Sequence, residues 1–326
     1  MKYLFINFLI VSLFSVQFTM AVEKTKVIFD TDTNNELDDQ NALAYLLLNE
    51  ATFEVLGVTI NATRNGGDVS EHYKEAERIV QLCDKKGTKL LTGVNGDFET
   101  IKPTLKEKKH DGYEAVDFII QQVKKYKKEV VVLAVGKLTN VALAIEKDPS
   151  IIPDLNLVWL GTNYPNFREY NFVNDYAAMN YIARTDAHFE IVPCRYNMDS
   201  GSAHVKVFKE EGIVDKMKGL GPTVNKGIEG RHGGEFTNLG DYLSSLFEHI
   251  KYYSTPPSRS LFDMVAVAII KNPDWAVKTE VTAFVFENER WNTISKDHRK
   301  VIMWEFFDEK AILDDFFKTL STAKDN

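Results

Sequence analysis

Short apolar runs alternate along the chain with longer stretches in which apolar residues recur at helical spacing. The apolar runs, each of strand length, are Lys26–Asp30, Phe53–Ile60, Lys89–Leu91, Val130–Val135, Leu155–Leu160 and His188–Val192. The helical stretches between them are Asp39–Asn49, Asp68–Lys86, Tyr113–Tyr126, Thr139–Glu146 and Asp175–Arg184. This alternation predicts βαβ units, and therefore an open, Rossmann-like α/β fold with a mostly parallel central sheet flanked by helices.

Two of the predicted strands, Val130–Val135 and Leu155–Leu160, are apolar nearly throughout. Strands of this kind are covered by helices on both faces, so we place them at the centre of the sheet. Glycines crowd residues 205–240, which predicts a loop-rich insertion. Helices and strands are expected again at Asp241–Tyr253, Leu261–Lys271, Thr279–Phe286, Lys300–Trp304 and Asp308–Leu320. One domain over residues 22–326 is the simplest organisation.

The first 21 residues have the composition of a secretory signal peptide. Met1-Lys2 gives a short positive start, the run from Tyr3 to Phe18 is almost wholly apolar, and Thr19-Met20-Ala21 has the small-x-small form of a cleavage site. Polar residues interrupt the apolar run, which is also short for a membrane span of about 20 residues. We therefore expect cleavage near Ala21, export to the periplasm or the medium, and no stable membrane anchor.

The charge balance limits which partners are expected, and the cysteine content indicates whether a disulfide forms. The chain has 47 acidic and 39 basic side chains, with a net charge of −8, so we expect no broad basic face and no nucleic-acid partner. Cys83 and Cys194 are its only cysteines. Cys83 occupies an apolar position of a helical pattern, which favours two buried thiols over a disulfide.

Five acidic residues lie within ten positions at the end of the first predicted strand: Asp30, Asp32, Glu36, Asp38 and Asp39. Asp30 and Asp32 are two apart on a strand and so share a face, whereas Asp38 and Asp39 begin the next helix, near its positive end. Ligands of open α/β sheets bind at the carboxyl ends of the strands. One interpretation is a helix cap among solvated acids. The other, which we favour for the whole set, is a site for a hard divalent cation such as Ca²⁺.

Three further segments carry the polar residues of a known family in the same order. They are Val135-Gly136-Lys137-Leu138-Thr139-Asn140, then Asn163 followed by Glu169-Tyr170-Asn171 and Asp175-Tyr176-Ala177-Ala178, and finally Phe262-Asp263-Met264-Val265-Ala266. Together with the acidic run, they resemble the nucleoside hydrolases of the inosine-uridine-preferring group over most of the chain. The resemblance implies a calcium-dependent N-glycosidase that releases ribose and a purine or pyrimidine base from a small-molecule nucleoside, and a homo-oligomeric assembly.

Residue by residue, the resemblance implies one metal site and one sugar site. The calcium ligands would be Asp32, Asp39, the Thr139 carbonyl and Asp263. The residues that bind the ribose hydroxyls would be Asp38, Asn163, Glu169 and Asn171. Asp32 would also take the proton of the attacking water as general base. Negative charge near the sugar suits this chemistry, because hydrolysis passes through an oxocarbenium-like state.

Two features depart from the family's pattern. The loop Thr33–Leu37 holds five residues, more than is usual, so its polar residues are expected near the sugar or the ion. Phe262 stands where the family has the histidine that protonates the leaving base. A phenylalanine can stack on a base but donates no proton. Replacement acids are His110 and His232, although a surface position is the simpler interpretation for each.

Two other functions fit parts of the sequence. Asp30-Thr31-Asp32-Thr33 after an apolar strand also matches the nucleophile motif of haloacid-dehalogenase-type phosphatases. That fold needs a late acidic pair after a strand, but Asp314-Asp315 lies in an amphipathic C-terminal helical pattern. The second alternative is an exported nucleoside- or ribose-binding relative, which would keep the metal and sugar contacts but have lost the leaving-group acid at Phe262.

Overall fold

The computed structural model describes residues 23–294 and 299–323. The predicted signal peptide, residues 1–21, lies outside this range. Among the helices of the described ranges, none is long and apolar enough to cross a membrane. Cys83 and Cys194 are both free and buried, which confirms the expectation of two core thiols.

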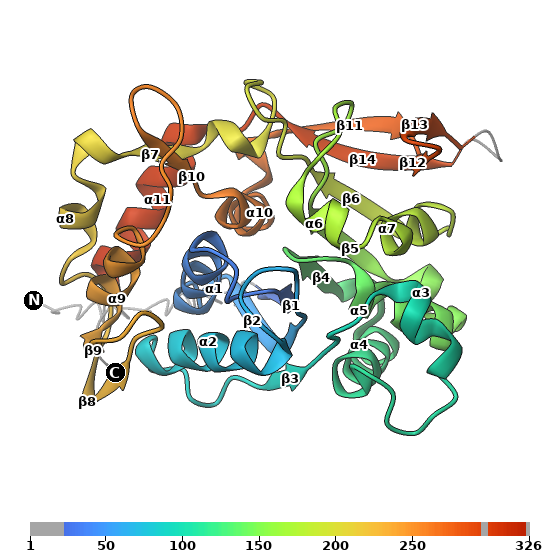
Figure 1. The fold of residues 1–326 in the computed structure, drawn as a ribbon, viewed down its shortest axis with the longest axis horizontal. Helices are drawn as coiled ribbons and strands as arrows, with labels where there is room; N and C mark the ends of the chain where they lie inside the picture. Colours follow the sequence, from blue (N-terminus) through green and yellow to red (C-terminus); the bar gives the residue numbers. More distant parts are fainter. Residues whose placement is uncertain (1–22, 295–298, 324–326) are drawn as a thin grey trace, which may run out of the picture.

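An eight-stranded sheet runs through the middle of the molecule (Figure 1). Its strands are β1 (Thr25–Thr31), β2 (Phe53–Ile60), β3 (Leu90–Thr92), β4 (Val130–Ala134), β5 (Asn156–Leu160), β6 (His188–Val192), β11 (Val277–Thr282) and β14 (Lys300–Glu305). They lie in the order β11-β14-β6-β5-β4-β1-β2-β3, and only the β11–β14 pair is antiparallel among these described strands. The predicted mostly parallel sheet is confirmed, with β4 and β5 at its centre.

Helices cover both faces of the sheet (Figure 1). One core contains α1 (Asp38–Leu48), α2 (Val69–Leu82), α9 (Leu239–Leu246), α10 (Phe262–Lys271) and α11 (Glu309–Thr322). The other contains α4 (Tyr113–Tyr126), α5 (Thr139–Lys147) and α7 (Tyr176–Ala183). Alternate residues of β1 supply the two cores: Val27 and Phe29 enter the first, and Ile28 the second. Buried strand residues therefore point to both faces, as their continuous apolar character predicts.

The structure differs from the sequence prediction in the last third of the chain. The helix expected over Asp241–Tyr253 begins at Leu239 and ends at Leu246. Pro256 and Pro257 lie farther along the chain, in a turn over residues 254–257. The strand expected over Thr279–Phe286 divides into β11 and β12 (Phe284–Glu287). Asn288 and Glu289 both have positive φ, which a tight hairpin turn requires, and β12 leaves the sheet to pair with β13 (Arg290–Thr293).

The glycine-rich insertion is more ordered than expected, since it contains α8 (Ile213–Met217) and a hairpin of β8 (Thr223–Glu229) with β9 (Glu235–Asn238).

The sheet itself determines where a ligand can bind. From β1 the chain builds outward through β2 to β3, whereas β4, β5 and β6 build in the other direction. The boundary between β1 and β4 is therefore a topological switch point, where the connections diverge and leave a crevice at the carboxyl ends of the strands.

Candidate active site

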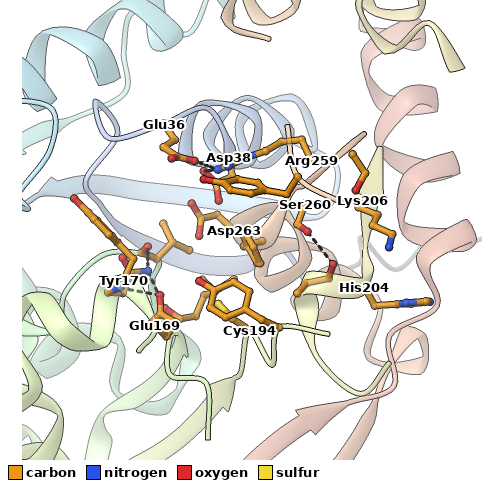
Figure 2. A pocket seen from close by; sticks show the side chains of 18 of the residues that line it. Glu36, Asp38, Glu169, Tyr170, Cys194, His204, Lys206, Arg259, Ser260 and Asp263 are labelled. Atoms are coloured by element: carbon orange, nitrogen blue, oxygen red, sulfur yellow. Dashed lines mark hydrogen bonds and ion pairs between the residues drawn. The ribbon is translucent and has the colours of Figure 1, made fainter. Parts of the chain in front are cut away.

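A pocket of about 630 Å³ lies at this crevice (Figure 2). One part of its wall is acidic and comes from the first turns of α1 and α10 and from residues 169–171. The rest comes from residues 194–206 and 253–262 and contributes aromatic and basic side chains. In Figure 2, Asp38 and Asp263 face the space that Glu169 borders from another side. The volume is in the range of small-molecule sites.

Three carboxylates meet at the centre of the acidic wall. Asp38, Asp39 and Asp263 are buried, and one oxygen of each lies within 4.8 Å of the others. Asp38 and Asp39 stand in the first turn of α1, and Asp263 stands in the first turn of α10. Both helix N-termini present positive partial charge to these side chains. Burial and mutual repulsion raise the pKa of Asp39 and of Asp263 well above the ordinary value of an aspartate.

Asp32 lies beside this cluster, immediately after β1. The Thr63 hydroxyl donates a hydrogen bond to Asp32 Oδ2, whereas Asp32 Oδ1 is buried and has no hydrogen-bond partner among the described residues. Burial, with the charge of Glu169, raises the pKa of Asp32 to about 7. A buried carboxylate oxygen without a partner is costly. These carboxylates offer only oxygen donors, repel one another, and include one oxygen without a partner. Together they therefore fit a hard divalent cation.

Asp30, the first residue of the acidic run, has a structural role. Its carboxylate accepts hydrogen bonds from Thr59 Oγ1 at 2.6 Å, Asn61 Nδ2 at 2.8 Å and Asn140 Nδ2 at 2.8 Å. These bonds join the ends of β1 and β2 to the first turn of α5. Asp30 thus holds together the elements that carry the site, while burial raises its pKa to about 6.

Glu169 and Asn171 form the wall expected to bind the sugar. Glu169 caps α6 (Tyr170–Asn174), and its carboxylate accepts hydrogen bonds at 2.8 Å from the backbone N–H groups of Thr162, Asn171 and Phe172. The Asn171 side chain donates to the Val135 carbonyl at 2.6 Å. Both side chains line the pocket and are fixed by the ends of β4 and β5, so they present oxygen atoms in set positions.

Two of the expected site residues are not among those that line the pocket. The Asn163 side chain does not line the pocket, because its oxygen accepts from the Tyr196 backbone N–H at 2.9 Å. Thr139 also lies outside the lining, and its hydroxyl donates to Asp175 at 2.5 Å. The residue of this segment that does reach the pocket is Val135, at the end of β4.

The structure brings neither candidate histidine to the pocket. His110 is buried, with Nδ1 at 2.9 Å from the Asp111 carbonyl and Nε2 at 3.1 Å from Lys147 Nζ. His232 is exposed and stacks on His249, with ring centroids 4.2 Å apart. Phe262 does line the pocket, where its ring meets Tyr196 edge to face.

Comparison with known proteins identifies the family. A model of the family "inosine-uridine preferring nucleoside hydrolase" matches residues 27–311. The chain belongs to this family. The family depends on a metal, and the buried aspartate cluster of this nucleoside hydrolase family member could hold such an ion.

Individual relatives of this family member are distant. Over 150 residues it is 28% identical to Probable uridine nucleosidase 1 of Oryza sativa subsp. japonica, a match that spans 40% of this chain and 44% of the rice protein. A plant nucleoside hydrolase has the same fold with a TM-score of 0.70 at 16% identity, covering 92% of this chain and 100% of the other. For a purine-preferring ribonucleoside hydrolase from Gardnerella vaginalis the TM-score is 0.68 at 20% identity, with 91% and 98% covered.

The long loop Thr33–Leu37 of this family member forms part of the pocket wall. The Glu36 carboxylate pairs with the guanidinium of Arg259, and both residues line the pocket. Arg231 fixes the loop from outside by donating to the carbonyls of Asn35 at 3.1 Å and Glu36 at 2.9 Å. Asn35 and Glu36 are thus the loop residues that line the pocket.

Sequence reasoning missed Arg259, Tyr196 and Tyr253, all of which line the pocket. Arg259 is only 5% exposed, and burial lowers its pKa to about 10, so it remains charged at neutral pH. The only sequence signal for Arg259 is its place three residues before Phe262, next to the segment that carries Asp263.

Proposed function

We propose that this chain hydrolyses the N-glycosidic bond of a ribonucleoside and requires Ca²⁺. One observation carries the proposal: Asp32 keeps a buried, unpartnered oxygen next to the clustered carboxylates of Asp38, Asp39 and Asp263, and this cluster and Glu169 line one pocket. The pocket thus offers a group of carboxylates for a cation and acceptors for sugar hydroxyls, with Asp32 as a proton acceptor directly behind the cluster. These are the three requirements for displacing a base from ribose by water.

The cation would be held by carboxylates of β1, α1 and α10. Asp32, Asp39 and Asp263 are the ligands we propose, with Asp38 completing the cluster and the Val135 carbonyl as a main-chain oxygen at the pocket wall. A donor set of several carboxylates favours Ca²⁺, which accepts six to eight oxygens, over Mg²⁺, which keeps much of its water. When bound, the ion would lower the pKa of a water molecule and fix its position.

The protein's own groups would supply the remaining steps. Asp32 takes one proton from the attacking water as the oxygen bonds to the anomeric carbon. The clustered carboxylates stabilise positive charge that develops on the sugar ring. Asp38, Glu169 and Asn171 orient the ribose by hydrogen bonds to its hydroxyls, which both donate and accept. The Thr139 carbonyl as a calcium ligand and Asn163 as a ribose ligand stay predictions.

The direct test is ribose release. Purified protein supplied with Ca²⁺ should liberate ribose and free base from inosine or uridine. A reducing-sugar assay detects the ribose, and chromatography detects the base. Binding of nucleoside without any ribose would instead indicate a binding relative. Release of phosphate from a phosphate ester with Mg²⁺, and no ribose, would indicate the phosphatase. Against the phosphatase stands Asp315, whose carboxylate lies in α11 and accepts from Lys271 at 2.5 Å.

The stability of the cation-free protein should fall as the pH rises. The pKa values of Asp32 and Asp38 are raised to about 7 in the folded chain, against about 3.9 when unfolded. The folded state therefore binds more protons than the unfolded state between these values, so its stability declines with pH and the loss is complete above about pH 7. We expect the Tm of chelated protein to be lower at about pH 8 than at about pH 5.

Calcium should reverse this trend, because it binds the ionised carboxylates of the folded state and not the unfolded chain. The rise in Tm on adding Ca²⁺ should be larger at about pH 8 than at about pH 5. Comparing both conditions at each pH by calorimetry removes the contribution of groups outside the site. An equal rise at both pH values would count against these carboxylates as the ligands.

A further inference from the structure

A buried arginine faces the pocket from an element that the proposed chemistry does not use. Arg259 lies in β10 (Ser258–Ser260), which pairs with β7 (Lys206–Phe208) and leads directly into α10. Its Nη2 pairs with Glu36 and lies 3.8 Å from Asp38 Oδ1, while Nε is buried without a hydrogen-bond partner in the described part of the chain. Burying a guanidinium with incomplete pairing is costly, so its donors are available for another partner.

Aromatic side chains share the pocket with the guanidinium. The Arg259 guanidinium carbon lies 5.9 Å from the ring centroid of Tyr253. Tyr196 and Phe262 meet edge to face with their ring centroids 5.8 Å apart, and all of these side chains line the same pocket. Flat apolar faces next to a fixed planar cation suit a heteroaromatic ring that carries hydrogen-bond acceptors.

Arg259 lies between the acidic and the aromatic parts of the pocket, because its Nη2 is 3.8 Å from Asp38 Oδ1 and its guanidinium carbon is 5.9 Å from the Tyr253 ring centroid. Figure 2 shows its side chain above Asp263 and directed to Asp38 and Glu36, away from Glu169. A ribose held by Asp38 and Glu169 would fill the acidic part of the pocket. The attached base then extends into the part lined by Arg259, Tyr196 and Phe262. The acidic part would repel a base that departs with negative charge, whereas Arg259 would attract it.

We propose that Arg259 is the catalytic residue that stabilises the departing base, a role for which Phe262 has no suitable group. The proposal rests on the proposed nucleoside hydrolysis. As the C–N bond breaks, its electron pair moves to the base, and Arg259 donates hydrogen bonds to an acceptor atom of that base without losing its own proton. The base anion then takes a proton from solvent, while Asp32 returns to solvent the proton that it took from water. The preferred substrates are ribosides of bases with an oxo group or an unprotonated ring nitrogen.

The test compares two leaving groups in Arg259→Met. For inosine or uridine, kcat should fall about 10²- to 10³-fold, the usual effect of removing one transition-state donor. For p-nitrophenyl riboside, whose phenolate leaves without help, kcat should change less than about tenfold. Retained cleavage of this riboside also shows that the variant is folded. The matched control is Arg290→Met, which removes an exposed arginine of β13 and should leave both activities unchanged.

Two further measurements separate leaving-group stabilisation from a structural role. Guanidinium ion added to Arg259→Ala should restore inosine turnover at least about tenfold and leave p-nitrophenyl riboside turnover unchanged. Arg259→Lys should stay impaired on nucleosides, because an ammonium lacks the planar fork. Equal losses on both leaving groups, or a weakened calcium affinity without rescue, would overturn the proposal. If the unaltered protein cleaves neither compound, nucleoside hydrolysis itself has failed, and this outcome is distinct from failure of the Arg259 assignment.

Discussion

Asp32→Asn lowers kcat for nucleoside hydrolysis by about 10³-fold, within the range for loss of a general base. The amide occupies the same volume after β1 and can still accept from Thr63, so the fold should persist. It cannot take a proton from water, and it removes one negative charge from the group around Asp39 and Asp263. Steady-state kinetics on inosine and uridine, with Tm measured in parallel, give the result.

The matched control is Asp215→Asn. Asp215 lies in α8 and does not line the pocket, and its carboxylate pairs with Lys218 Nζ at 3.1 Å. This variant should keep full activity. If Asp32→Asn retained kcat within about tenfold of the unaltered protein, Asp32 would not be the base, and the proton acceptor would have to be sought among Asp38 and Glu169.

Removal of divalent cations by a chelator should lower activity by at least about 10³-fold, because bound metal is what brings the pKa of water near neutrality. Ca²⁺ should restore activity, with one ion bound per chain. Calorimetric titration measures the stoichiometry, and ribose release measures the activity. Mg²⁺ should restore it poorly, since the clustered oxygens of Asp38, Asp39 and Asp263 suit a larger ion with more ligands.

Asp263→Asn tests the metal site separately from the general base. It removes a charge from the cluster without touching the general base, so calcium affinity should fall and excess Ca²⁺ should recover part of the activity. Unchanged calcium affinity in this variant would remove α10 from the metal site. Full activity in the presence of chelator would contradict the metal dependence altogether.

Much of the fold could be predicted because local patterns determine it. β2 and β6 have the predicted bounds, Phe53–Ile60 and His188–Val192, and α4 begins and ends at the predicted residues, Tyr113 and Tyr126. The acidic run was predictable for the same reason. Asp32, Asp38 and Asp39 are neighbours in sequence, and a βα unit necessarily brings its first turn to the strand's carboxyl end.

The side of the pocket that contains Arg259 was less predictable, because it depends on contacts between distant segments. Arg259 meets Glu36 only after β10 and the long Thr33–Leu37 loop have packed together, and no local period encodes that contact. The histidines illustrate the opposite error. His110 and His232 have suitable chemistry, but Lys147 and His249 are their neighbours in the folded chain. The directions in which loop side chains point follow from tertiary packing and not from residue type.

A crystal structure of the protein with Ca²⁺ and ribose tests the central claim most directly. The account predicts one ion, identified by its anomalous signal, between Asp32, Asp39 and Asp263, with ribose hydroxyls bound by Asp38, Glu169 and Asn171. The face of the sugar that carries the base should open toward Arg259. An ion bound away from these aspartates, or ribose bound outside this pocket, would contradict it.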